Sequence, residues 1–329
     1  MSATTKHHLK RRSPDVAGAS LTHGSASGGD PRRGRRSADV FDPAPATGDP
    51  GAATNGAPPE HLRISVAASI DRARSIGRAT LDETQEPNRT RVRALVADLG
   101  EAAADEIVPM GTMIVRADGG SMRTFSGGLS HENGWWPSWK RHRLQHFEGM
   151  AQRDQILLSE CSPDVEWFQS EGRRFEFTDA GEKHLYTCDL EERGVDGRIG
   201  IVEVKRGPRD LDDAGYRRKL AVVAEICRLC DMDFRIVYRN EIFANRRHRA
   251  NVELFASRRF ARVDPLHLHR LETSAYARGS VLTYADLADL IEPGRPHAGK
   301  AVIQALLIRR RVAIDLTARL HDETPVTIV

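Results

Sequence analysis

Four short extended runs between two helical stretches constrain the fold of this chain more than any other feature of its sequence. Helical spacing covers Arg141–Leu158 before the runs and Asp210–Cys230 after them, and a buried strand is predicted at Phe234–Tyr238. Glycine-containing turns separate the runs. This order predicts an α/β fold, with a mixed sheet that has helices on both faces. The four runs are Val165–Gln169, Arg174–Thr178, Leu185–Glu191 and Ile199–Lys205.

Composition divides the chain into four parts. Residues 1–60 are mainly Gly, Pro, Ala, Ser and Arg, and they lack the large apolar side chains that offset ordering entropy, so we expect a disordered basic tail. Residues 61–123 predict a helical and extended region, and residues 124–262 contain the sheet. Residues 263–329 begin with a linker over Val263–Thr273, where the pattern weakens, and continue as a small domain.

The small C-terminal domain has the sequence pattern of a winged helix. Thr283 can cap a helix over Tyr284–Ile291, and a second helix is predicted over Ala298–Arg310. Val312–Leu316 and Val326–Val329 can pair as a hairpin. Two helices followed by a hairpin are typical of the helix-turn-helix-wing arrangement.

Charge and cysteine content limit the compartment and the partners. The net charge is +3 with a pI near 8.7, so binding to a polyanion would depend on local clusters of basic residues. Four cysteines are too few for a disulfide scaffold in a chain of 329 residues. No apolar run reaches the ~18 residues of a membrane span, and the chain does not start with an apolar signal core. We expect a bacterial cytoplasmic protein without a membrane partner.

The residues that carry chemistry gather at one end of the predicted sheet. Glu203 and Lys205 are two positions apart, so their side chains share one face of a strand. Val202 and Val204 then point into the opposite layer. Asp189 arrives from a neighbouring run across a glycine turn. Two carboxylates and one ammonium group are therefore expected to converge.

This set of groups suits phosphodiester cleavage with Mg²⁺. Asp189 and Glu203 supply hard oxygen ligands, and the backbone carbonyl of Val204 can supply another. A bound metal lowers the pKa of a water ligand and neutralises charge on the scissile phosphate. Lys205 can orient the attacking water or stabilise the developing charge. The sequence therefore predicts an Mg²⁺-dependent nuclease.

A Glu-x-Lys pair on a strand is more often a solvated cross-strand pair than part of a metal site. Here the pair follows the apolar run Ile199-Gly-Ile-Val202 and is trailed by Gly207-Pro208. An acidic residue lies upstream at hairpin distance, and a long helix follows. This context favours the nuclease interpretation.

At these residues the sequence resembles the TnsA-like transposon endonucleases, a branch of the PD-(D/E)xK nuclease superfamily. Members of that family carry Tyr-Thr-Pro-Asp-Phe and then an apolar strand that ends in Glu-Val-Lys or Gln-Val-Lys; here the corresponding stretches are Tyr186–Leu190 and Ile201–Lys205. Arg153-Asp154 also resembles the family's helix. The likeness covers about Thr124 through Ile242 and extends loosely to the C-terminus.

The resemblance implies a restriction-endonuclease-like core and a winged-helix-like C-terminal domain. It also implies a role that residue spacing does not show. Such proteins cut the strand at a transposon end that an integrase-type transposase leaves intact, in a complex with that transposase and an AAA-type ATPase regulator. We therefore expect double-stranded DNA at transposon ends as the substrate and association with the nucleoid.

The chain departs from the family pattern at several positions. Gln152 stands where the family carries a metal-associated Glu, and an amide is a poorer metal ligand than a carboxylate. Glu148 lies four residues earlier, on the same face of the expected helix, and can complete the site instead. Cys188 replaces the family's Pro, and Glu171-Gly172 replaces a Gln-Pro. Two alternatives stay open: an impaired nuclease that only binds DNA or partner proteins, and a nuclease of defence or repair.

Basic residues after the sheet are candidate DNA contacts. Arg246, Arg247 and Arg249 lie on the helical stretch that follows the last strand, and Arg309 and Arg310 end the second C-terminal helix. Arginines of this kind can grip phosphates. At the end of a helix they are equally favoured by the helix dipole.

Two further patterns have structural interpretations. Cys227-x-x-Cys230 has redox or zinc spacing, but it lies in a predicted helix without a second pair of ligands, so buried thiols are expected. Trp135, Trp136 and Trp139 are expected to anchor a loop on the core rather than to stack on bases.

Overall fold

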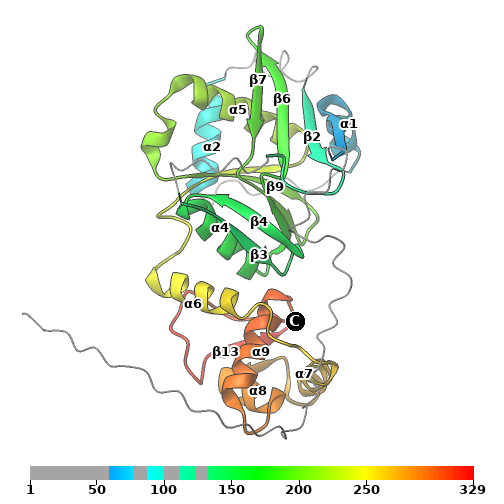
Figure 1. The fold of residues 1–329 in the computed structure, drawn as a ribbon, viewed down its shortest axis with the longest axis vertical. Helices are drawn as coiled ribbons and strands as arrows, with labels where there is room; N and C mark the ends of the chain where they lie inside the picture. The colour runs from blue at the N-terminus through cyan, green and yellow to red at the C-terminus, as the bar shows by residue number, and fades with distance from the viewer. Residues whose placement is uncertain (1–58, 77–86, 100–110, 124–131) are drawn as a thin grey trace, which may run out of the picture. The chain divides into compact units, whose positions relative to one another are not determined.

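The computed structural model describes residues 59–76, 87–99, 111–123 and 132–329. The tail predicted over residues 1–60 lies outside the described residues except for its last two positions. The described part combines helices with several sheets, which confirms the α/β class (Figure 1).

The central sheet has the strand order β10-β9-β8-β5. β9 runs parallel to β10 and antiparallel to β8, which in turn runs antiparallel to β5. Parallel neighbours need a crossover connection, and the long helix between β9 and β10 supplies it. The sheet is therefore mixed, as predicted, but the run predicted over Arg174–Thr178 is not part of it and lies in another sheet. Its strands are β5 (Val165–Ser170), β8 (Leu190–Gly194), β9 (Ile199–Lys205) and β10 (Asp233–Tyr238).

Two helices cover opposite faces of this sheet. They are α4 (Met150–Cys161) and α5 (Ala214–Leu229). Ile156 of α4 shares a buried cluster with Val202 and Val204, whereas Leu220 of α5 shares another with Ile201. Adjacent residues of β9 thus face different helices because side chains alternate along a strand. The predicted orientation of the two valines, away from the face of Glu203, is confirmed.

A second, antiparallel sheet has the order β1-β2-β6-β7. The extended run predicted over Leu185–Glu191 is split between the two sheets, because the chain leaves β7 at Thr187 and enters β8 at Leu190. Asp189 therefore lies at the crossing point. A short 3₁₀ helix, η2 (Pro208–Leu211), follows β9. The strands and helices of this part are β1 (His61–Ser65), α1 (Val66–Ile76), α2 (Pro87–Ala97), β2 (Thr112–Arg116), β6 (Arg173–Asp179) and β7 (Glu182–Thr187).

The helix predicted over Arg141–Leu158 is wrong in its first half. A hairpin of β3 (Asn133–Ser138) and β4 (Arg143–Glu148) occupies this region, and α4 starts only after Gly149, whose φ of 89° is left-handed. Leu144 and Phe147 are three residues apart and imitate helical spacing. Glu148, expected on the helix, is instead the last residue of a strand.

The β3–β4 hairpin is fastened to the C-terminal part of the chain by arginines stacked on tryptophans. The guanidinium of Arg259 lies 3.9 Å from the ring centre of Trp136, and that of Arg309 lies 4.1 Å from the ring centre of Trp139. Such contacts stabilise most when they are desolvated. The anchoring role predicted for these two tryptophans is confirmed, whereas the side chain of Trp135 is 51% exposed.

Polar contacts fix the hairpin to the end of α4. The Glu160 carboxylate accepts hydrogen bonds of 2.6 Å from the Ser138 hydroxyl and from the Trp139 amide. Lys140 donates to three carbonyls where α4 ends and β5 begins, which satisfies acceptors that the end of a helix leaves unpaired. Those carbonyls belong to Ser159, Ser162 and Val165.

The C-terminal part begins with a helix where a linker was predicted. Asp264 and His267 form a capping box at the start of α7, so the expected linker over Val263–Thr273 is wrong. The predicted cap at Thr283 is confirmed, since its hydroxyl accepts from the Asp286 amide. The elements are α6 (Arg246–Ser257), α7 (Pro265–Arg278), β11 (Val281–Thr283), α8 (Tyr284–Ile291), α9 (Pro296–Ile308), β12 (Val312–Ala313) and β13 (Pro325–Ile328).

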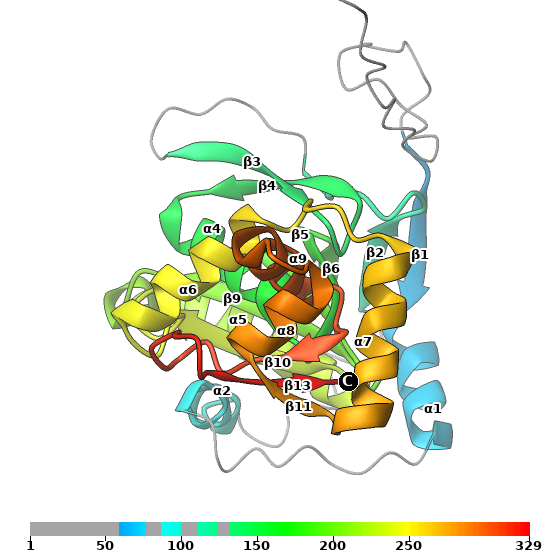
Figure 2. The ribbon, with the colours of Figure 1, turned by 90° about the horizontal axis from the view of Figure 1, so that it is seen from below.

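α9 is a core helix. Residues 302–308 are all buried, and the helix packs against α6 and α8 (Figure 2). At Gly299 a Cβ would lie 2.1 Å from the carbonyl oxygen of Ala288, so α8 and α9 approach closely there. Leu157 and Cys161 of α4 belong to the same hydrophobic cluster as these helices. One helix therefore serves both the sheet and the C-terminal core.

Within the described residues, no helix has both the length and the apolar character that crossing a bilayer requires. In the Cys227-x-x-Cys230 motif at the end of α5, the Cys227 thiol is buried in the core, as predicted, whereas Cys230 is only partly buried against it.

Candidate functional site

The structure brings Asp189, Glu203 and Lys205 together. Leu190 pairs with Val202 in the β8–β9 register, which sets the preceding residue, Asp189, beside Glu203. The Oδ2 atom of Asp189 accepts a hydrogen bond of 2.8 Å from the Val204 amide. This bond fixes the carboxylate at the end of β9. The backbone carbonyl of Val204 as a metal ligand stays a prediction.

Glu203 is the centre of a hydrogen-bonded network. Its side chain is buried, and its Oε2 atom accepts a bond of 2.5 Å from the Tyr186 hydroxyl. Its Oε1 atom contacts the Tyr216 hydroxyl and the Lys205 ammonium group. Burial and then the Glu203 carboxylate raise the pKa of both phenols, so both remain protonated donors.

The pKa values of both Lys205 and Asp189 are raised in the site. Burial works against the Lys205 ammonium, but the carboxylates of Glu203 and Asp189 outweigh it and hold the pKa of Lys205 above its ordinary value. Burial and the neighbouring Glu203 raise the pKa of Asp189 to about 8. Lys205 and the Val204 amide act in the opposite direction without cancelling this shift.

Gln152 bridges two backbone groups of the site. Its Nε2 atom donates to the Asp189 carbonyl at 3.0 Å, and its Oε1 atom accepts from the Glu148 amide at 2.5 Å. A carboxylate cannot donate, so only an amide makes both bonds. The side chain is buried in α4. Gln152 was predicted as part of the metal shell, and in the structure its side-chain atoms position the chain around the site.

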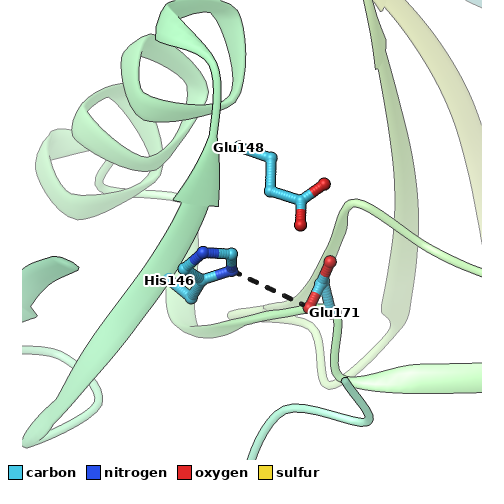
Figure 3. A group of neighbouring side chains, drawn as sticks. All are labelled: His146, Glu148 and Glu171. Atoms are coloured by element: carbon cyan, nitrogen blue, oxygen red, sulfur yellow. Dashed lines mark ion pairs between the residues drawn. The ribbon is translucent and has the colours of Figure 1, made fainter. Parts of the chain in front are cut away.

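A second group of possible metal ligands lies next to Asp189. It consists of His146 and Glu148 on β4 and Glu171 in the turn between β5 and β6; one ligand atom from each lies within 4.8 Å of the others (Figure 3). His146 and Glu171 are buried, and Glu148 is exposed. The Glu171 carboxylate also raises the pKa of Asp189. These residues can hold a metal ion.

His146 and Glu171 were not predicted as ligands. The pattern His146-x-Glu148 places both side chains on one face of a strand, but a helix was predicted there, which separates them. Glu171 was noted only as a departure from a family motif. Its backbone is left-handed, with a φ of 50°, which the sequence does not predict for a glutamate.

The predicted DNA-binding arginines differ in their surroundings. Arg246 and Arg247 are exposed on the first turn of α6. Arg249 is half-buried and lies 3.5 Å from Asp154 and 3.2 Å from Glu253. Arg309 stacks on Trp139 and donates to the Ala261 carbonyl, and Arg310 follows α9 with a left-handed φ of 60°.

No protein-family model matches this sequence, and no curated protein matches it significantly. The functional interpretation therefore depends on the geometry of the site.

Proposed function

We propose that the protein is an Mg²⁺-dependent DNA endonuclease. The observation that supports this most is the convergence of Asp189, Glu203 and Lys205 at the end of β9, with Glu148 tied to Asp189 through Gln152. Carboxylates beside one ammonium group are the set that metal-assisted phosphodiester hydrolysis needs.

The residues present fit a hard divalent cation. The Val204 amide fixes one oxygen of Asp189, which leaves the other for a cation. Burial and then the Glu203 carboxylate raise the pKa of Asp189 more than Lys205 lowers it, and a divalent ion would favour the ionised carboxylate when it binds. Asp189 and Glu203 would hold that ion.

Each protein group then has a distinct task. When bound, Mg²⁺ supplies a water of lowered pKa and neutralises charge on the phosphate. Lys205, held against Glu203, donates to a phosphate oxygen or orients the attacking water. Tyr186 and Tyr216 fix the Glu203 carboxylate through their hydroxyls, which limits the reorganisation that the reaction requires.

The order of the elements supports the same proposal. The series α4, β5, β8, β9, α5, β10 is a helix, three strands, a helix and a strand, as in a restriction-endonuclease-like core, and β6–β7 is an inserted hairpin. The series α7, β11, α8, α9, β12, β13 follows the order of a winged helix. Within this proposal the role is that of a TnsA-like subunit, which cuts transposon ends with an integrase-type transposase and an AAA-type ATPase.

One observation favours a second candidate, an impaired nuclease that only binds DNA or partners. Both oxygens of Glu203 already have protein partners, and Gln152 supplies no carboxylate. Calorimetric titration with Mg²⁺ separates the two: an Mg²⁺ site that is lost in Glu203→Gln excludes the impaired version.

Cleavage is tested with the purified protein and the transposase encoded beside it, on a plasmid that carries the transposon ends, in Mg²⁺. Asp189→Asn should lower the nicking rate at least about a hundredfold. Asp196→Asn, an exposed turn residue, is the matched control and should cut normally. Undiminished cleavage by Asp189→Asn would refute the proposal. A gene neighbourhood without transposase or ATPase, in a chain that still cuts, would point to defence or repair.

A further inference from the structure

We propose that His146, Glu148 and Glu171 bind a divalent first-row transition-metal ion, at a position separate from that of the Asp189–Glu203 pair. The three ligands come from two fixed places, the end of β4 and the turn that follows β5. This proposal holds whether or not the protein cleaves DNA.

The spacing of the ligand atoms supports one shared ion. Nδ1 of His146 lies 4.0 Å from Oε2 of Glu171 (Figure 3), beyond the ~3.2 Å limit of an ordinary hydrogen bond. Two atoms that each lie about 2.1 Å from one ion are roughly 3.0 to 4.2 Å apart, depending on the angle at the ion. The remaining separations, at most 4.8 Å, need to close by about half an ångström.

The backbone holds these ligands in place before any ion binds. The Glu171 amide donates to the Asp189 carbonyl at 3.0 Å, and the Glu171 carbonyl accepts from the Met122 amide at 2.7 Å. On β4, the Glu148 amide donates to Gln152. His146 lies against the ring of Trp135, with 5.1 Å between the ring centres. Little ordering entropy is therefore left for the ion to offset.

The polar surroundings leave room for a positive charge. Glu171 is 3% exposed, and its carboxylate accepts a 3.0 Å bond from the Ser121 hydroxyl, while the half-exposed Arg123 lies 3.5 Å away. Glu148 adds a second carboxylate at the solvent side. One guanidinium at this distance offsets two carboxylates only in part, and a divalent cation would complete the balance.

The imidazole of His146 favours a transition-metal ion over Mg²⁺ at this site. Mg²⁺ prefers an all-oxygen shell that includes several waters, whereas imidazole suits Zn²⁺, Fe²⁺ and other transition ions. Mn²⁺ accepts carboxylates readily and lies at the weak end of the transition-metal affinity order, so it is a stringent probe. One imidazole and two carboxylates therefore predict retention of Mn²⁺ in the presence of excess Mg²⁺.

The test is an electron paramagnetic resonance titration of the metal-stripped full chain with Mn²⁺ in excess Mg²⁺, in which binding removes the signal of the free ion. Wild type should bind one Mn²⁺. His146→Gln and Glu148→Gln should each weaken binding at least about tenfold, because even residues that only support a metal ligand cost 10–100-fold. His184→Gln, on β7, is the matched control histidine and should bind normally.

The proposal is overturned if wild type binds no Mn²⁺ under these conditions, or if His146→Gln binds it as wild type does. Since His146 is buried, each variant is first compared with wild type by circular dichroism and Tm in EDTA. Glu148 is exposed, so its substitution tests the site even if the histidine variant unfolds. Asp189→Asn should keep the affinity of this site for Mn²⁺ within about twofold of wild type, although it should abolish nicking. The two measurements therefore distinguish a failure of this proposal from a failure of the proposed nuclease function.

Discussion

Replacing Gln152 with Glu distinguishes a positioning residue from a lost metal ligand. If the amide is a bridge, Gln152→Glu removes the donor to the Asp189 carbonyl and turns an acceptor oxygen toward it. That carbonyl keeps one partner, the Glu171 amide at 3.0 Å, so the loss is limited. If Gln152 is only a weakened ligand, the added carboxylate should instead strengthen Mg²⁺ binding.

The expected loss follows from burial and hydrogen bonding. Gln152 is 5% exposed, so water has little access to replace the donor that the Asp189 carbonyl loses. Since this carbonyl keeps the Glu171 amide, the loss should lie toward the lower end of the range of about 1–3 kcal/mol that a buried polar group without a partner costs. The new carboxylate also lies near Asp189, whose pKa is already raised to about 8, so its charge adds to an unfavourable balance.

The assay is urea unfolding in EDTA and again in saturating Mg²⁺, with Gln152→Met as the reference variant. Gln152→Met removes both bonds without adding charge, so Gln152→Glu should be less stable than Gln152→Met in EDTA. A Gln152→Glu protein that equals wild type in EDTA and binds Mg²⁺ tenfold more tightly would refute the bridge.

Three further predictions concern other regions of the molecule. Gly299→Ala should lower the free energy of unfolding by about 1–3 kcal/mol through overpacking, measured by urea unfolding, whereas Gly215→Ala, whose Cβ has ordinary contacts, should not. Burial lowers the pKa of Lys140 from the ordinary 10.5 to about 8. Between these two pH values the unfolded chain binds a proton that the folded chain has released. The free energy of unfolding of wild type relative to Lys140→Met should therefore rise with pH across this range. Arg246→Ala should reduce the salt dependence of DNA binding by about one ion. Arg309→Ala should lower Tm but leave the salt dependence of DNA binding unchanged.

The sequence carried enough information to predict the sheet because its alternation is strong. Val202 and Val204 against Glu203 define two faces of β9, and the apolar run around them is long enough to mark a buried strand. The approach of Asp189 to Glu203 was predicted from the glycine turn between their two runs. These features are local, so one sequence is enough to predict them.

The rest depends on contacts between distant residues. Glu171 meets His146 only because the β3–β4 hairpin folds back over the turn after β5, which no local pattern encodes. Leu144 and Phe147 fit helical spacing, although in β4 their three-residue separation puts them on opposite faces, so a short apolar pattern was misleading here. The split of the run at Asp189 between two sheets was equally hidden, since both halves have strand-like alternation.

The β3–β4 hairpin connects the C-terminal helices with a carboxylate of the candidate site. One end of it is clamped by Arg309 on Trp139, and the other end carries Glu148. The two strands between these ends are paired along their whole length. We therefore expect a substitution at the Arg309–Trp139 contact to be felt at Glu148 through the backbone pairing of the hairpin.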